Sequence, residues 1–213
     1  MLGAAAMVAC SLDTGTNPFG SISDLSVSPA NVRLSVGESR EVVCSALDPA
    51  GRPLERIPPV TWFVPNARVA LLEQVSPNDR ARQRITGTGV GTADTQCTYD
   101  GFSAAVLINV VPFVVTATAV PATQTVGQTT TVTLSVATET GQAFPLLPPY
   151  QVVWSSSATG VMQVATSGNG GTATLTALAP GLATITASLR GFSDVGEVGR
   201  WSLAVTVQAA TGS

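Results

Sequence analysis

The stretch SVGESREVVC, residues 35–44, is written a second time as TVGQTTTVTL at residues 125–134, ninety positions later. Both copies place a Val-Gly pair just before a run in which apolar residues recur at every second position. Alternation with period two is typical of a β-strand with one buried face, and glycine is common in the turn before it. Each copy is therefore predicted to be the turn that enters the second strand of its own structural unit.

The remainder of the chain keeps the same offset. The matching positions are Ile85-Thr86 with Leu175-Thr176, Gly91 with Gly181, and Gly101-Phe102-Ser103 with Gly191-Phe192-Ser193. Trp62 corresponds to Trp154 after a slip of two residues, which a surface loop can absorb. Matching turns and matching apolar positions predict two copies of one fold.

Both copies are dominated by short runs rich in valine, threonine and alanine, separated by turn residues. Runs of this kind predict an all-β sandwich or barrel, and period two assigns their inward face. The inward set of the first copy is Val42, Cys44, Ala46, Val60, Trp62, Val64, Ala93, Thr95 and Cys97. The inward set of the second copy is Val132, Leu134, Val136, Val152, Trp154, Ala183, Ile185 and Ala187.

Several motifs resemble the bacterial immunoglobulin-like group-2 domain. They are LSVGESREVVCSALD, PVTWFV and GTGVGTADTQCTYDGF in the first copy, and QTVGQTTTVTLSVAT, VVWSSSATGVMQV and LTALAPGLATITASLRG in the second, which matches more closely. The resemblance covers roughly residues 24–208 and implies two tandem immunoglobulin-like β-sandwiches joined by a short linker. The expected organisation is an N-terminal segment and tether at 1–23, domain 1 at 24–112, domain 2 at 113–209 and a tail at 210–213.

Three cysteines are present. The order Cys44, Trp62, Cys97 resembles the inter-sheet disulfide of immunoglobulin domains, which packs against a buried tryptophan. The resemblance implies a Cys44–Cys97 disulfide worth about 4 kcal/mol on the chain-entropy model. Two buried free thiols are the alternative. The second copy has Leu134 and Ala187 at these positions.

The first ten residues, MLGAAAMVAC, resemble a bacterial lipoprotein signal because small and apolar residues precede Cys10 and a serine follows it. The resemblance implies that Cys10 is acylated after cleavage and that residues 11–23 form a tether. The segment departs from the pattern, since no positive charge precedes the apolar run and the run is short. An apolar arm with Cys10 free, or paired between chains, is the alternative.

Composition and charge argue against several functions. The net charge is −3, with no lysine and no histidine, so the chain lacks the basic face that nucleic-acid binding needs and the usual general base and zinc ligand. We therefore expect no enzyme activity, cofactor or metal. Arg80, Arg82 and Arg84 alternate on one strand face, which indicates either a solvated strand edge or a contact for an anionic partner. Residues 104–120 are apolar, but Pro112 interrupts them, so we expect two strands and a linker with little slack rather than a transmembrane helix.

An uncharged stretch marks the candidate contact surface. Residues 140–189 contain no charged side chain, and within them AFPLLPPY, residues 143–150, is an apolar loop stiffened by prolines. The predicted partner-binding residues are Phe144, Leu146, Leu147 and Tyr150, with Trp201 of the later loop as a second contact. The alternative is that the loop folds back as a lid over the end of the sandwich.

Taken together, these features predict a non-enzymatic, extracytoplasmic protein-binding or structural module of a bacterial envelope. The expected partner is another protein, and an envelope membrane complex, on which the chain would sit as an extrinsic subunit, is one candidate. Membrane contact would run only through the lipid anchor. A surface adhesin-like module or a carbohydrate-binding module is the alternative.

Overall fold

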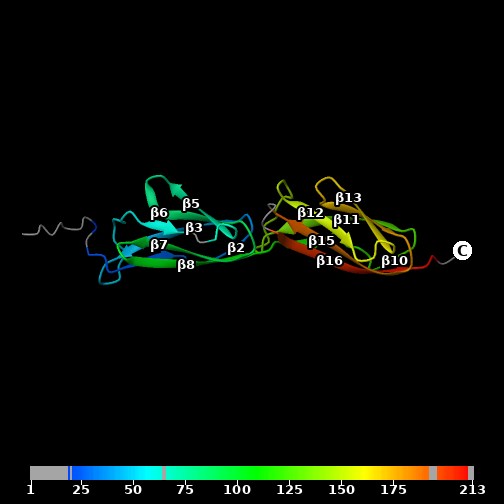
Figure 1. The fold of residues 1–213 in the computed structure, drawn as a ribbon, viewed down its shortest axis with the longest axis horizontal. Helices are drawn as coiled ribbons and strands as arrows, with labels where there is room; N and C mark the ends of the chain where they lie inside the picture. The colour runs from blue at the N-terminus through cyan, green and yellow to red at the C-terminus, as the bar shows by residue number, and fades with distance from the viewer. Residues whose placement is uncertain (1–18, 20, 64–65, 192–195, 211–213) are drawn as a thin grey trace, which may run out of the picture.

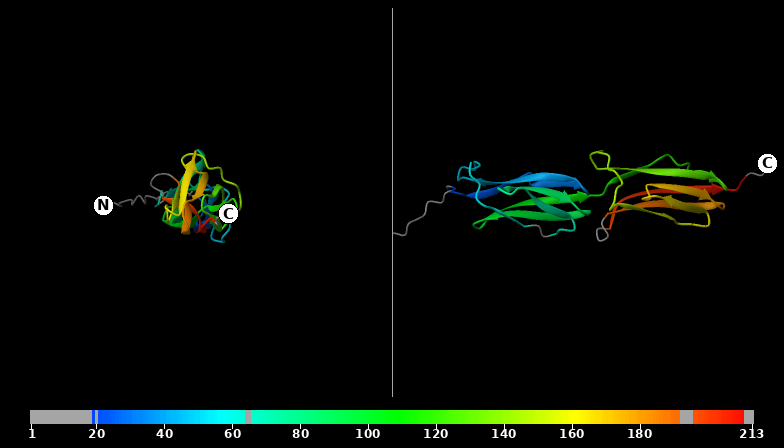
Figure 2. Two further views of the ribbon diagram at one scale, coloured as in Figure 1. Left: turned by 90° about the vertical axis from the view of Figure 1, so that its right-hand side faces the viewer. Right: turned by 90° about the horizontal axis from the view of Figure 1, so that it is seen from above.

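The computed structural model describes residues 19, 21–63, 66–191 and 196–210. In these residues the chain forms sixteen β-strands and four sheets. Figure 1 shows two β-sandwiches placed end to end, and Figure 2 shows that they lie along a common line. The described part of the chain contains no helix with the length and apolar character needed to cross a bilayer.

The first sandwich is built from two four-stranded sheets. One sheet has the order β1-β3-β6-β5, formed by Asp24–Ser28, Ser39–Leu47, Asp79–Gly87 and Ala70–Ser76. The other has the order β2-β8-β7-β4, formed by Asn31–Ser35, Phe102–Val111, Gly91–Tyr99 and Thr61–Phe63. The first strand is split between the sheets, because β1 pairs antiparallel with β3 whereas β2 pairs parallel with β8.

The second sandwich repeats this topology strand for strand. One sheet has the order β9-β11-β14-β13, formed by Val114–Ala117, Thr129–Ala137, Thr172–Ala177 and Met162–Ser167. The other has the order β10-β16-β15-β12, formed by Thr123–Thr125, Glu197–Gln208, Gly181–Arg190 and Gln151–Ser156. Its first strand is split in the same way between β9 and β10. The predicted fold class, two tandem immunoglobulin-like sandwiches, is confirmed.

The repeated phrase forms the same turn in both sandwiches. Gly37 and Gly127 have φ angles of 82° and 87°, a left-handed conformation that glycine adopts without steric cost. The Gly37 N–H donates to the carbonyl of Gly87 at 2.8 Å, and the Gly127 N–H donates to the carbonyl of Ala177 at 2.8 Å. Each turn leads into β3 or β11. Because the first strand is split, these are the third strands of their units rather than the second.

The predicted inward residues that the structure describes lie inside. Val42, Cys44 and Ala46 are fully buried, and so are Ile185 and Ala187 in the second sandwich. Trp62 and Trp154 are half-buried, because each indole sits at the sheet margin and donates its N–H to a carbonyl, of Arg80 at 2.9 Å and of Gly170 at 2.6 Å. Val64 lies outside the described residues.

The buried residues form three clusters instead of one core for each sandwich. One surrounds the cysteines at the far end of the first sandwich, and another contains Met162 and Leu175 in the far part of the second. The third runs through the joint and includes residues of both sandwiches, such as Val36 and Ile108 of the first and Val152 and Leu189 of the second. Because this cluster is shared, the domain limits 24–112 and 113–209 stay a prediction.

The arginines of β6 do not form a sheet edge. β6 lies between β3 and β5, so the predicted solvated edge is wrong. Arg84 is 3.5 Å from a carboxylate oxygen of Glu41, and Arg82 is 3.7 Å from the carboxylates of Glu41 and Asp79. These pairs lie on the exposed face of the sheet, where ion pairs contribute little to stability.

Candidate functional site

The joint between the sandwiches has an aromatic centre. Phe113 follows the last strand of the first sandwich, is buried, and donates its N–H to the carbonyl of Val198 at 2.8 Å. Its ring centroid lies 4.5 Å from that of Phe144 and 5.8 Å from that of Tyr150, and the latter two are 5.1 Å apart. Such distances are typical of packed aromatic pairs. The three rings, here called the aromatic trio, connect the linker to the proline-rich loop of the second sandwich.

The repeated turn of the first sandwich rests on this trio. A Cβ atom added at Gly37 would lie 3.2 Å from the ring of Phe144 and 3.5 Å from the hydroxyl of Tyr150. Burial at this contact raises the pKa of the Tyr150 phenol. The glycine of the turn therefore serves two purposes, because it provides the left-handed backbone and leaves room for the neighbouring sandwich.

A polar network joins the same two elements at the surface. The Arg33 guanidinium donates to both carboxylate oxygens of Glu139, at 2.6 and 2.7 Å, and the Glu139 N–H donates to the Ser35 hydroxyl at 2.9 Å. The Glu38 carboxylate accepts the Ser35 N–H at 2.7 Å and the Thr140 hydroxyl at 3.4 Å. The hydrogen bond from Arg33 lowers the pKa of Glu139, and the same contact raises the pKa of Arg33. Since Arg33 and Glu139 are largely exposed, their pair fixes geometry more than it adds stability.

A groove of about 480 Å³ follows this network. It is lined by Glu38 and Arg40 from the first sandwich and by Thr140, Gln142 and Phe144 from the second, among others. These groups can form hydrogen bonds and apolar contacts. In the described part of the chain, no group of three or more His, Cys, Asp or Glu side chains is arranged to hold a metal ion.

The predicted partner-binding loop has two kinds of residue. Phe144 and Tyr150 belong to the aromatic trio, and Leu146 packs against the central cluster. Only Leu147 points clearly outward, with 61% of its surface exposed. Phe144, Leu146 and Tyr150 therefore fit the lid alternative, because their side chains pack against the central cluster. Partner contact through Leu147 stays a prediction.

Trp201 is not part of an exposed loop. It lies on β16, half-buried, with its ring centroid 5.9 Å from that of Trp154. The pair packs between the central cluster and that of the far part of the second sandwich. Its role as a second partner contact stays a prediction, and the indole packs on Trp154 inside the fold.

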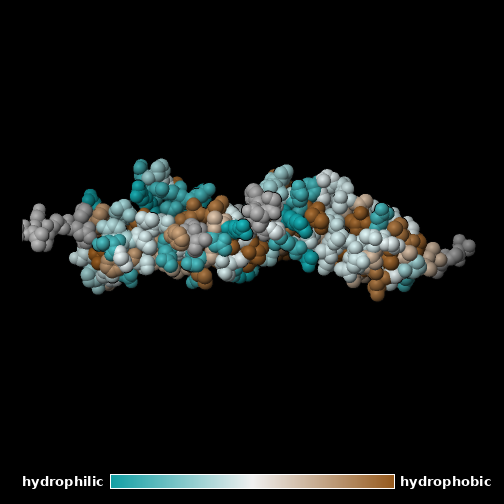
Figure 3. Space-filling model, in the orientation of Figure 1, coloured by the Kyte–Doolittle hydropathy of each residue, from teal (hydrophilic) through white to brown (hydrophobic). Residues whose placement is uncertain are grey.

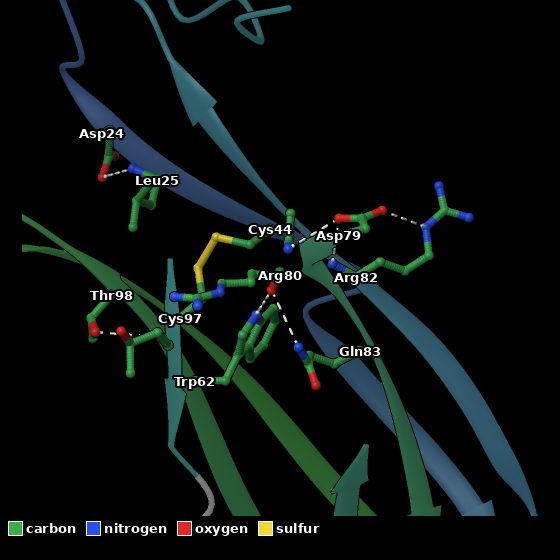
Figure 4. The surroundings of a disulfide bond; sticks show 12 residues. Asp24, Leu25, Cys44, Trp62, Asp79, Arg80, Arg82, Gln83, Cys97 and Thr98 are labelled. Atoms are coloured by element: carbon green, nitrogen blue, oxygen red, sulfur yellow. Dashed lines mark hydrogen bonds and ion pairs between the residues drawn. A yellow bond between two sulfur atoms is a disulfide. The ribbon is translucent and has the colours of Figure 1, made fainter. Parts of the chain in front are cut away.

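The cysteines of the first sandwich form a disulfide. It joins Cys44 on β3 to Cys97 on β7, and therefore connects the two sheets, with the Cα atoms 6.4 Å apart (Figure 4). Figure 4 also shows Trp62 beside it, with its indole directed to the carbonyl of Arg80. Cys10, the predicted lipidation site, lies outside the described residues.

The polar half of the joint is missing from the sequence-based expectations. The sequence did contain a signal for these contacts, because the charged residues involved depart from the ninety-residue repeat. Arg33 and Glu38 correspond to Thr123 and Gln128 in the second copy, and Glu139 is the one charged residue between Asp100 and Arg190. Charges that break an otherwise neutral repeat could have been interpreted as partners of one another.

No protein-family model matches the sequence, and the search of curated proteins finds no match either. The bacterial group-2 assignment therefore stays a prediction. Among solved structures, domains 1–6 of the surface-layer protein SbsC are 17% identical with a TM-score of 0.39, covering 91% of this chain and 29% of that one. The Yersinia pseudotuberculosis adhesin InvE is 17% identical with a TM-score of 0.35, covering 87% and 60%. The D00-D0 domains of intimin are 14% identical with a TM-score of 0.35, covering 86% and 99%. At such identities the likeness concerns the fold alone, and this chain spans less than a third of the SbsC structure.

Proposed function

We propose that this chain is a non-enzymatic, extracytoplasmic module in which two sandwiches act as one stiff unit that presents a protein-contact surface. The central observation is the buried cluster that runs across the joint, closed by the contact of Gly37 with Phe144 and Tyr150. A shared core resists bending far more than a flexible linker does, because bending would expose apolar surface to water.

The disulfide supports an extracytoplasmic location. Disulfides persist in oxidising compartments such as the periplasm and the cell surface and are rare in the cytosol. The pair is fully buried and connects two sheets, so it has the position of a structural bridge. Lipid anchoring through Cys10 is the finer part of this proposal, and the intact mass of protein isolated from its native cell would test it.

The proposed contact surface is the exposed tip of the proline-rich loop. Leu147 is the large apolar side chain there, and the neighbouring Pro148 and Pro149 are exposed as well. The carbonyl of Leu146 accepts a hydrogen bond from Asn169, which holds the base of the tip. A rigid apolar tip binds a protein with little loss of conformational entropy.

An envelope membrane complex is the partner we favour within this proposal. Its test is co-purification from detergent-solubilised membranes of the native cell, comparing the wild-type chain with Leu147→Asp. Recovery of the complex with the wild type but not with the variant would support the docked subunit. Recovery of a free lipoprotein in both cases would contradict it and favour an adhesin-like module. Carbohydrate binding is disfavoured because all three tryptophans are half-buried in the fold.

The stiffness itself can be tested in solution. Spin labels placed on exposed strand residues, Gln96 in the first sandwich and Thr184 in the second, report the distribution of distances between the sandwiches. We expect one narrow distribution, unchanged by moderate salt. A broad distribution would contradict the stiff unit, whatever the partner. A matched pair of labels within the first sandwich, at Gln96 and Ser103, gives the width expected from the labels alone.

A further inference from the structure

β13, which spans Met162–Ser167, is an edge strand of the second sandwich. It pairs antiparallel with β14 without a register shift, and it is the last strand in the order of its sheet. It contains no charged residue and no proline, and four of its six side chains are exposed. Sheet edges in proteins commonly carry charges, prolines or bulges that prevent pairing with another chain. The edge of β13 lacks each of these protections.

The hydrogen bonds beside β13 show which of its main-chain groups are free. The Leu178 N–H donates to the carbonyl of Val161 at 2.8 Å, so the bonds to β14 fall on the odd-numbered residues of this segment. The N–H and C=O groups of Val164 and Thr166 therefore point away from β14, and no other described segment bonds to them. A hollow of about 330 Å³, lined by Thr166 and Pro149 among others, shows that the proline-rich loop does not close over the strand.

The equivalent edge of the first sandwich, β5, has the protection that β13 lacks. Val69 and Val161 accept hydrogen bonds from the turns that precede β7 and β15, which makes them equivalent, so Ala165 stands where β5 has Glu73. β5 also has a register shift near its end. Figure 3 shows mostly pale surface of intermediate hydropathy where Figure 1 places β13, and hydrophilic surface over β5 and β6.

We propose that β13 pairs antiparallel with β13 of a second copy of this chain, around a two-fold axis at Ala165. This register places Val164 of one copy opposite Thr166 of the other, so both free residues of each strand exchange main-chain hydrogen bonds. Ala165 then faces Ala165 of the second copy, with the Cα atoms about 4.5 Å apart, as in a pair that is not hydrogen-bonded. Gln163 faces Ser167 of the second copy, and both side chains are uncharged and exposed.

The edge itself specifies a second copy as its occupant. The free groups of one β13 complement those of another, and no like charges meet. β5 could not pair with itself in this way, because Glu73 would lie opposite the same carboxylate of the second copy. A two-fold contact uses one patch on both copies and closes at a dimer.

The contact is small, since it joins two strands of six residues, so we expect weak association. It involves only the second sandwich. The dimer therefore goes beyond the proposed stiff unit and does not rest on it, and the stiffness can be measured separately in dilute solution.

Sedimentation equilibrium of the full chain, from dilute to millimolar concentration, tests the pairing. We expect a monomer–dimer equilibrium. Ala165→Glu introduces the residue of the first sandwich and should weaken dimerisation by about tenfold or more, because two carboxylates would meet at the axis. Thr131→Glu is the matched control and should leave dimerisation unchanged, since it adds the same charge to an exposed position of β11, inside the same sheet.

Cysteine cross-linking tests the register. In a chain that also carries Cys10→Ser, Ala165→Cys should form a disulfide between copies under mild oxidation, because the expected Cα separation lies within the range that a disulfide spans. Gln163→Cys should not, because the two substituted positions would lie about 13 Å apart along the paired strands.

Circular dichroism of each variant confirms that it is folded. A chain that remains monomeric at millimolar concentration overturns the proposal, and so does growth beyond a dimer, which a two-fold contact does not allow. A dimer that Ala165→Glu leaves intact, or that Thr131→Glu weakens equally, would place the contact away from this edge. Equal cross-linking of Gln163→Cys and Ala165→Cys would contradict the axis at Ala165.

Discussion

The two sheets of each sandwich are joined in different ways at equivalent positions of the two copies. In the first, Cys44 and Cys97 connect the sheets covalently, in the cluster that lies away from the second sandwich. In the second, the equivalent Leu134 and Ala187 belong to the central cluster and are packed next to the joint. One fold thus secures equivalent positions by a disulfide in the first sandwich and by packing beside a neighbouring sandwich in the second. The comparison suggests that the disulfide and the joint are alternative solutions to one stability problem.

Among the changes considered, we expect removal of the disulfide to have the largest effect on the free energy of unfolding. The double change Cys44→Ala and Cys97→Ala opens a loop with a sequence separation of 53. We expect it to lower the free energy of unfolding of the first sandwich by about 4 kcal/mol, because the unfolded chain regains the entropy of that loop. Urea unfolding followed by hydrogen exchange, sandwich by sandwich, measures this. Loss of stability of equal size in the second sandwich would contradict the division of roles.

The next largest loss of stability is expected when a side chain fills the space at the turn of the joint. Gly37→Ala and Gly127→Ala introduce the same strained backbone, which costs roughly 1–2 kcal/mol for a side chain in the left-handed region. Gly37→Ala also pushes a methyl group toward Phe144 and Tyr150, for which we expect a further 1–3 kcal/mol, roughly the cost of overpacking a core. Thermal unfolding of both variants gives the difference. If the two variants are equally stable, the turn does not bear on the joint.

The second copy places an amide where the first has an apolar side chain. Gln124 corresponds to Leu34 and is buried, and neither polar atom of its amide has a hydrogen-bond partner in the described residues. Gln124→Leu should therefore raise the free energy of unfolding by about 1–3 kcal/mol, the cost of an unpaired buried polar group. The reciprocal Leu34→Gln should lower it. Denaturant titration measures both, and a destabilised Gln124→Leu would show that the amide is paired in solution.

The smallest effect concerns pH at the polar half of the joint. The pKa of Glu139 is lowered by its hydrogen bond with Arg33, so the stabilisation is present above the ordinary carboxyl pKa and is lost as pH falls through the lower value in the folded state. Glu139→Gln should abolish this acid-range change. Asp48→Asn is the control, because the pKa of Asp48 is also lowered, chiefly by the backbone N–H of Arg52, but within the first sandwich. Chemical shifts around Ser35, followed through an acid titration, distinguish them. The same shift changes in both variants would argue against the pair across the joint.

Much of each sandwich follows from local pattern. Period two placed Val42, Cys44 and Ala46 inside, because alternation along a strand does not depend on what lies beyond the sheet. The joint could not be predicted from local pattern. Contacts such as that of Arg33 with Glu139 join residues far apart in the sequence and depend on how a loop folds back. For the same reason, the sequence could not decide between an exposed contact loop and a lid at residues 143–150. Phe144 looks free when read alone and is covered only once the turn at Gly37 is in place.

The central claim is that the two sandwiches share a core and move as one body. Residual dipolar couplings of backbone amides test it most directly, because each sandwich reports its own alignment. We predict that the couplings from strands β3, β6, β7 and β8 and those from β11, β14, β15 and β16 fit one alignment tensor in the orientation of the structure. Two tensors of different magnitude would show independent motion and contradict the claim.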